Sequence, residues 1–135
     1  MTFTESVQTC LRKYAGFSGR AGRPEFWWFM VFNVLVSFVT SIVDMAVFGS
    51  DAVWAGIGFG PDQGPFQLIS AFLLLLPDLA VGARRLHDTA RSAWWLLLLL
   101  VPFLGLLVLV VLWCLRGEAG TNRYGEPPVR TGPPR

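Results

Sequence analysis

The chain has 135 residues, of which 53% are hydrophobic and 15% are charged, and its mean hydropathy is +0.52. Soluble domains carry about 25% charged residues, so this composition excludes an ordinary soluble domain and, over most of the length, intrinsic disorder. Two distant cysteines, Cys10 and Cys114, do not make a disulfide scaffold, and a net charge of +2 is too small to indicate a nucleic-acid partner.

Residues 2–14 are predicted to form a short amphipathic helix that lies on the membrane surface. Thr2 and Glu5 have the spacing of a capping box, which satisfies two free amides at the start of a helix. Apolar side chains then recur at helical period at positions 3, 7, 10, 11 and 14, and the basic residues 12 and 13 lie off that stripe. The alternative is a frayed, disordered terminus.

Three apolar segments follow, over residues 26–48, 66–83 and 93–115, and the third contains no charge. A bilayer core about 30 Å thick is crossed by roughly 20 apolar residues in a helix, so each segment is a candidate transmembrane helix. The first segment is too long for a signal peptide and follows a charged stretch, so we expect it to stay in the membrane. The sequence therefore predicts an all-α membrane protein, a small bundle of three transmembrane helices preceded by the surface helix.

The predicted organisation has three parts: a cytoplasmic amphipathic segment over 1–25, a transmembrane domain over 26–116, and a flexible Pro- and Gly-rich tail over 117–135. Four Lys and Arg residues precede the first span, none lies in the loop 49–65, and three lie in the loop 84–92. Because short cytoplasmic loops are rich in Lys and Arg, the N-terminus and the second loop are predicted to be cytoplasmic.

The side of the membrane on which the tail lies depends on the third segment. If this segment spans, the four arginines of residues 116–135 lie outside, which conflicts with the charge rule. If Pro102 and Gly105 fold it into a re-entrant hairpin, the tail is cytoplasmic. Trp95 and Trp113 would lie about 27 Å apart along one helix, close to the core thickness, and this spacing favours the spanning alternative.

Three motifs stand out together, at residues 14–29 (YAGFSGRAGRPEFWWF), 83–95 (ARRLHDTARSAWW) and 117–125 (GEAGTNRYG). Their order and spacing strongly resemble the domain-of-unknown-function 805 family of small bacterial inner-membrane proteins, over about residues 11–128. The resemblance implies a multi-pass protein of the bacterial inner membrane. It implies no catalytic residue and no cofactor, because the family has no established activity.

Charged residues of the first two motifs are predicted to lie on the same side of the membrane, at its cytoplasmic surface. Arginine offers forked donors to phosphate, and clustered cations attract the negative leaflet, so these residues are candidates for binding an anionic headgroup or a partner. The alternative is an ordinary positive-inside loop with an aromatic anchor. The candidates are Arg20, Arg23, Arg84, Arg85, His87, Asp88 and Arg91.

Two residues of this region have further interpretations. Glu25 could pair with one of the arginines of the second loop and tie the two loops together, or remain a solvated charge. His87 beside Asp88 could be half of an acid–base device, but the chain has a single histidine and no nucleophile placed near it. No second histidine or cysteine pair has metal-ligand spacing either. A structural imidazole in a tight loop is therefore favoured over a catalytic one.

The first span carries a polar stripe at helical spacing: Asn33, Ser37, Thr40, Ser41 and Asp44. Such a stripe faces a neighbouring helix or a water-lined cavity, and a packing seam is the favoured interpretation. In the second span Asp78 is predicted at the depth of Asn33, within reach of Asn33 or Ser37, because an unpaired carboxyl at that depth costs about 2.5–3.5 kcal/mol. The competing partner is Arg85, seven residues later on the same helix face.

These observations favour a non-enzymatic structural or interaction protein whose basic loops contact anionic lipid or a protein partner. An alternative is a subunit of a small transporter or channel that uses Asp78 and the polar stripe. Three helices enclose little of a pore, so that alternative requires a homo-oligomer. An enzyme acting on lipid phosphates through residues 84–91 is a third, less favoured alternative.

Overall fold

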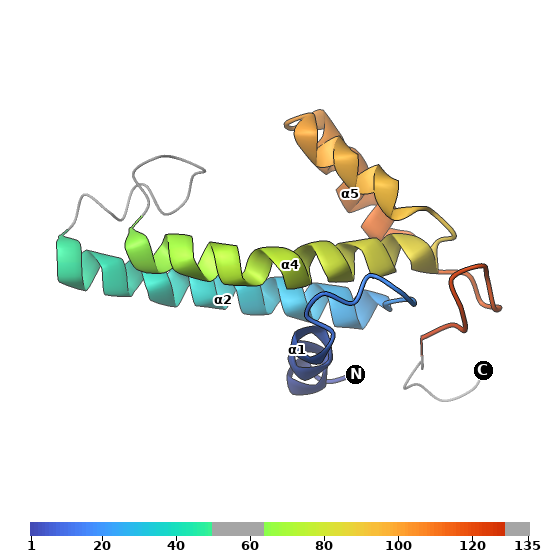
Figure 1. Ribbon diagram of the computed structural model, residues 1–135, viewed down its shortest axis with the longest axis horizontal. Helices are drawn as coiled ribbons and strands as arrows, with labels where there is room; N and C mark the ends of the chain where they lie inside the picture. The colour runs from blue at the N-terminus through green and yellow to red at the C-terminus, as the bar shows by residue number, and fades with distance from the viewer. Residues whose placement is uncertain (50–63, 129–135) are drawn as a thin grey trace. The chain divides into compact units, whose positions relative to one another are not determined.

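The computed structural model describes residues 1–49 and 64–128, and these fold into helices and connecting turns (Figure 1). Their contacts divide the chain into two compact units. The terminal unit holds residues 1–29 and the described residues from Pro77 onward, and the central unit holds the described residues of 30–76. The helices in chain order are α1 (Phe3–Arg12), α2 (Arg23–Phe48), α4 (Pro65–Asp88), the 3₁₀-helix η1 (Ala93–Leu100) and α5 (Leu104–Cys114).

Helix α1 begins at the predicted capping box. The hydroxyl of Thr2 accepts a hydrogen bond from the Glu5 amide at 3.4 Å, and the Glu5 carboxylate accepts one from the Thr2 amide at 2.8 Å. These bonds to Thr2 lower the pKa of Glu5, because they stabilise the ionised carboxylate. The face of α1 that carries Cys10 is buried in the terminal unit, whereas Leu11 is exposed. The location of α1 on a membrane surface stays a prediction.

Helices α2 and α4 are the two described helices that are long and apolar enough to cross a membrane. With 26 and 24 residues they measure about 39 and 36 Å, more than the thickness of a bilayer core. Large apolar side chains stand exposed along both, including Val34, Phe38 and Phe72. They contain the predicted spans 26–48 and 66–83.

In the central unit Asp44 of α2 caps the first turn of α4. Its carboxylate accepts hydrogen bonds from the amides of Phe66 and Gln67 at 3.1 and 2.9 Å. The absence of a side chain at Gly64 makes room for it, since a Cβ there would lie 2.1 Å from the carboxyl carbon. Asp44 is only 1% exposed, so its carboxylate satisfies free helix amides inside the protein and does not reach water.

The remaining polar stripe of α2 is also used locally. Thr40 donates to the carbonyl of Val36 at 2.9 Å, and the Ser41 hydroxyl lies 3.4 Å from the side-chain oxygen of Gln67 on α4. Asn33 is half-buried and Ser37 is exposed, and both belong to the central unit. Asp78 belongs to the terminal unit, so its predicted pairing with them stays a prediction.

The third apolar segment, 93–115, is not the single transmembrane helix that the sequence favoured. It forms two short helices, η1 and α5, with a turn between them, and the two pack against each other. At about 16 and 17 Å, neither is long enough to cross a bilayer core. The chain path is the one that the hairpin alternative required, and its placement in a membrane stays a prediction.

Three local features explain the hairpin. Pro102 has no amide to continue a helix. Phe103 has a positive φ of 62°, and the Leu104 amide bonds the Pro102 carbonyl at 2.7 Å to close a three-residue turn. Gly105 then approaches the Leu98 carbonyl so closely that a Cβ would lie 1.7 Å from its oxygen.

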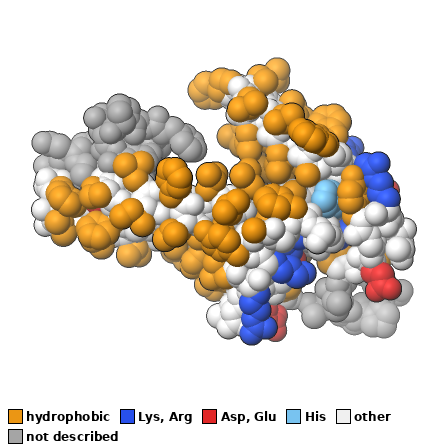
Figure 2. All heavy atoms as spheres, viewed as in Figure 1, with side chains coloured by type: hydrophobic (Ala, Val, Ile, Leu, Met, Phe, Trp, Pro, Cys, Tyr) orange, Lys and Arg blue, Asp and Glu red, His pale blue; other side chains and the backbone are white. Residues whose placement is uncertain are grey.

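The hairpin packs on the C-terminal end of α4 within the terminal unit. Leu109 and Leu112 of α5 form a buried cluster with Leu86 of α4, and the Trp113 indole donates to the Gly82 carbonyl at 3.3 Å. Trp113 is therefore a packing residue, not the anchor at the far interface that the 27 Å spacing had suggested. The surface of the hairpin that does not contact α4 is apolar and exposed, and Figure 2 shows hydrophobic side chains covering it. Phe103, at the tip of the hairpin, is 90% exposed.

Candidate functional site

Five charged side chains form a buried cluster in the terminal unit, called here the arginine cluster. Each is at most 6% exposed, although charged residues are rarely buried unless they are paired. Three guanidinium groups meet two carboxylates, so the cluster has one more positive than negative charge. Its members are Arg20, Glu25, Arg84, Arg85 and Asp88.

Asp88, the last residue of α4, pairs with two arginines. Its carboxylate lies 2.8 Å from Arg20 and 2.5 Å from Arg85. The rest of each guanidinium reaches the C-terminal part of the chain. Arg20 donates to the carbonyls of Glu118 and Gly120 at 2.5 and 2.6 Å, and Arg85 donates to the Trp113 carbonyl at 2.9 Å and to that of Leu115. Asp88 thus joins the N-terminal segment, the end of α4 and the exit of the hairpin.

Arg84 and Glu25 form a second buried pair, at 2.5 Å. This ion pair is the link between the two loops that was one of the two alternatives for Glu25. Cys10 of α1 lies against it, with its sulfur 3.8 Å from the Glu25 carboxylate and 3.9 Å from Arg84. Burial raises the pKa of the Cys10 thiol to about 12, and the Glu25 charge adds to the shift. Among the described residues, Nε of Arg84 has no hydrogen-bond partner.

His87 is held as a structural imidazole. Its Nδ1 lies 3.1 Å from the Gly19 carbonyl oxygen, and its ring stacks on Tyr124 with centroids 3.9 Å apart. Asn122 donates to the His87 carbonyl at 3.0 Å, and the Arg123 guanidinium lies over the Tyr124 ring. The third sequence motif therefore closes over the end of α4, and these contacts hold this part of the predicted tail against the helix.

The seven predicted site residues separate into two groups. Arg20, Arg84, Arg85, His87 and Asp88 lie close together in the structure, but they are buried and most of their donors and acceptors are used inside the protein. This burial argues against direct contact between those arginines and a headgroup. Arg23 is exposed, and Arg91 is half-buried with a long 3.5 Å contact to the Thr89 carbonyl.

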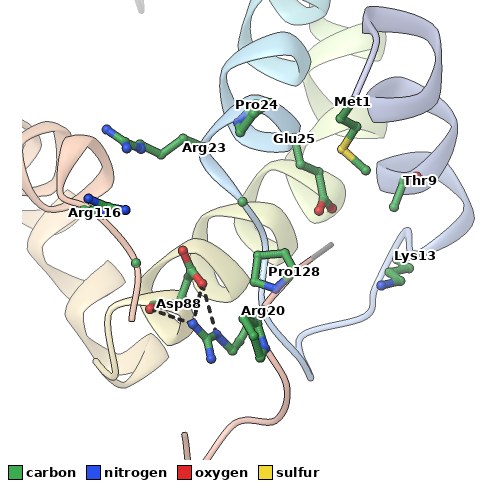
Figure 3. Close-up of a pocket in the computed structure, with 13 residues that line it drawn as sticks. Met1, Thr9, Lys13, Arg20, Arg23, Pro24, Glu25, Asp88, Arg116 and Pro128 are labelled. Carbon is green, nitrogen blue, oxygen red and sulfur yellow. Dashed lines mark hydrogen bonds and ion pairs between the residues drawn. The ribbon is translucent and has the colours of Figure 1, made fainter. Parts of the chain in front are cut away.

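A pocket of about 740 Å³ opens beside the arginine cluster (Figure 3). Its wall comes from α1, the start of α2, residues 116–117 and residues 127–128, with Arg20 and Asp88 at one edge. Three exposed cations line it: Lys13, Arg23 and Arg116. In Figure 3 Arg23 and Arg116 lie at one side of the pocket and Lys13 lies at the other.

Sequence reasoning named Arg23 but missed Lys13 and Arg116 as partners in one site. The available signal was their position: Arg116 directly follows an apolar segment, and Lys13 ends the N-terminal helix. Such cations next to membrane segments face the headgroup layer. Within residues 1–49 and 64–128, no group of three or more His, Cys, Asp or Glu is arranged to hold a metal ion.

Long apolar helices, an exposed apolar hairpin and charges gathered in buried pairs at helix ends are typical of a helical membrane protein. The sequence matches the family described as "Protein of unknown function (DUF805)" over residues 14–126, and the chain belongs to that family.

Named relatives agree with this class. The chain is 42% identical over 118 residues to "Inner membrane protein YhaH" of Escherichia coli (strain K12), covering 87% of this chain and 91% of the relative. It is also 42% identical over 118 residues to "Inner membrane protein YhaI" of the same strain, covering 87% and 90%. No solved structure matches the chain.

Proposed function

We propose that this protein is a non-enzymatic structural or interaction protein of the bacterial inner membrane, with its basic face in contact with anionic lipid headgroups. In this proposal α2 and α4 cross the membrane, the η1–α5 hairpin enters and leaves on one side, and both ends of the chain are cytoplasmic. The basic face consists of the Lys and Arg residues that lie outside the arginine cluster. The proposal concerns this whole surface and not one binding site.

The observation that carries the proposal is the distribution of basic residues together with the hairpin. All eleven Lys and Arg residues lie before Pro24 or after Ala83. A spanning third segment would divide them between the two sides of the membrane, whereas a hairpin keeps them on one side, in agreement with the charge rule. The hydrogen bonds from Arg85 and Arg20 to residues 113–120 support the same arrangement, because they bind the tail to the end of α4.

The arginine cluster supports a structural role over an enzymatic one. A catalytic acid, base or phosphate-binding arginine must reach the reacting group. Here Asp88 and Glu25 are engaged by arginines, and the His87 ring is covered by Tyr124. The transporter alternative requires polar groups that are available to a substrate. Asp44 of the polar stripe is not available in this way, since its carboxylate caps α4.

Topology is tested with a cysteine introduced at Thr121, an exposed residue of the tail, in a chain in which Cys10 and Cys114 are changed to Ser. A membrane-impermeant maleimide should leave this cysteine unlabelled in intact cells and label it after the inner membrane is permeabilised. Labelling in intact cells would place the tail outside and overturn the proposed arrangement.

Lipid contact is tested by measuring which lipids remain with the purified protein. We expect phosphatidylglycerol to be enriched over its share in the source membrane. Replacing five basic residues that are not in the buried cluster with Gln should remove that enrichment, because each charge near an anionic surface contributes about 1 kcal/mol. Lipids retained by the unchanged protein in the proportions of the membrane would overturn the proposal. The five are Arg12, Lys13, Arg23, Arg91 and Arg116.

A further inference from the structure

The pocket beside the arginine cluster has a charge balance that favours an anion. Its two acidic lining residues are Glu25 and Asp88, and both are already paired with buried arginines. Its three exposed cations form no ion pair with any described residue. The acidic groups therefore do little to offset the field that Lys13, Arg23 and Arg116 direct into the pocket.

The position of the pocket in the sequence places it at the level of lipid headgroups. Arg23 and Pro24 line it, and Trp27 and Trp28 follow within about one turn of α2. Both tryptophans are exposed, at 39% and 42%, as aromatic residues of the membrane interface are. Arg116, on the same side of the pocket as Arg23, comes directly after the last apolar residue of the hairpin segment.

We infer that this pocket binds the phosphate headgroup of one anionic phospholipid, an assignment that rests on the proposed function and narrows it to a single site. Arg23 and Arg116, on the same side, provide forked donors that suit phosphate oxygens, and Lys13 adds a positive charge from α1. A volume of about 740 Å³ is in the range of small-molecule sites and accommodates a glycerophosphate headgroup. Met1, Pro127 and Pro128 give the pocket apolar surface beside these charges.

The test titrates phosphatidylglycerol into detergent-solubilised, delipidated protein and follows the bound lipid by native mass spectrometry. Phosphatidylethanolamine and inorganic phosphate are titrated in parallel. We expect one saturable phosphatidylglycerol site, weaker binding of phosphatidylethanolamine, and inorganic phosphate that competes only poorly. Inorganic phosphate binding as tightly as phosphatidylglycerol would assign the pocket to a soluble phosphate compound and overturn the lipid assignment.

Single variants locate the site. Lys13→Gln, Arg23→Gln and Arg116→Gln should each lower the affinity for phosphatidylglycerol by about fivefold, and the triple variant by on the order of a hundredfold. Arg12→Gln is the matched control, because Arg12 is the exposed neighbour of Lys13 on α1 and does not line the pocket. Its affinity should fall far less than that of Lys13→Gln, because Arg12 belongs to the basic face but does not line the pocket. In a Cys114→Ser background, slow maleimide labelling of the buried Cys10 verifies that each variant retains the native fold.

The outcomes separate the site from the general proposal. If Arg12→Gln lowers the affinity as much as Lys13→Gln, the lipid responds to diffuse surface charge, and the pocket assignment fails while the proposed function stands. If the unchanged protein does not distinguish phosphatidylglycerol from phosphatidylethanolamine, both fail.

Discussion

The buried pair of Arg84 and Glu25 allows a quantitative prediction, because Cys10 lies against it and reports on its integrity. Removing one partner of a buried ion pair costs about 3–5 kcal/mol, since the other charge is left without compensation. Glu25→Gln retains an oxygen that accepts one hydrogen bond from Arg84, so we expect about 3 kcal/mol, the lower end. Water reaches the unpaired guanidinium when α1 separates from the pair, and the same opening exposes Cys10.

The assay is the rate at which Cys10 reacts with a maleimide in a Cys114→Ser background, where it is the single thiol. About 3 kcal/mol corresponds to a labelling rate about a hundredfold higher for Glu25→Gln. Glu126→Gln, which removes an exposed carboxylate, should leave the rate unchanged. Replacing the whole pair, with Glu25→Leu and Arg84→Met, should return the rate toward that of the original protein. Unchanged labelling in Glu25→Gln would show that the ion pair does not hold α1 in place.

Three further predictions concern other local contacts. Gly117→Ala places a Cβ 1.8 Å from the Asp88 carboxylate, so it should displace that group and lower the melting temperature, whereas Gly120→Ala, with open space around it, should not. Asp44→Ala removes the cap of α4 and should lower the free energy of unfolding by about 1–2 kcal/mol, measured by thermal or denaturant unfolding. The pKa of Cys10 is about 12 in the folded protein and 9.0 in an unperturbed thiol, so the unfolded chain loses this proton first as the pH rises. The free energy of unfolding should therefore fall between pH 9 and pH 12. Cys10→Ala should remove this pH dependence when unfolding is measured across the same range.

The features that could be predicted from the sequence depend on local pattern. The capping box at Thr2 and Glu5 requires residues only three positions apart, and it is present. The apolar content of 26–48 and 66–83 is sufficient to form long helices, and these are present as well. The link between Glu25 and an arginine of the second loop could be proposed from position alone. Glu25 directly precedes the first predicted span and Arg84 directly follows the second, so both lie on the same predicted side.

The features that were missed depend on three-dimensional approach. An arginine that binds a headgroup and one that is buried against Asp88 give the same charge pattern, so the burial of Arg84 and Arg85 could not be read from composition. The tail motif is rich in glycine, which indicates a turn but not the surface that the turn covers. Stacking of Tyr124 on His87 connects positions 37 residues apart, and no periodicity relates them.

The hairpin is the clearest case, because hydropathy alone makes 93–115 a good transmembrane helix. What prevents this is the contact between Gly105 and the Leu98 carbonyl, where a Cβ would lie 1.7 Å from a backbone oxygen that cannot move unless the hairpin opens. Ala also favours a helix by about 1 kcal/mol over Gly. Gly105→Ala should therefore open the hairpin, with an overpacking cost of about 1–3 kcal/mol, and let the segment form a continuous helix of about 34 Å, long enough to span.

Opening the hairpin has a consequence for topology, because a third crossing carries the tail to the other side of the membrane. The maleimide assay on a cysteine at Thr121 detects it: a fraction of Gly105→Ala should be labelled in intact cells, and its melting temperature should fall as the contacts of Arg20 and Arg85 to residues 113–120 are lost. Gly120→Ala is the matched control, since nothing lies within 4 Å of its added Cβ, and should behave as the original protein does. Native stability in Gly105→Ala together with an unlabelled tail would show that the close approach at Leu98 does not determine the hairpin. The turn at Pro102 and Phe103 would then have to hold it alone.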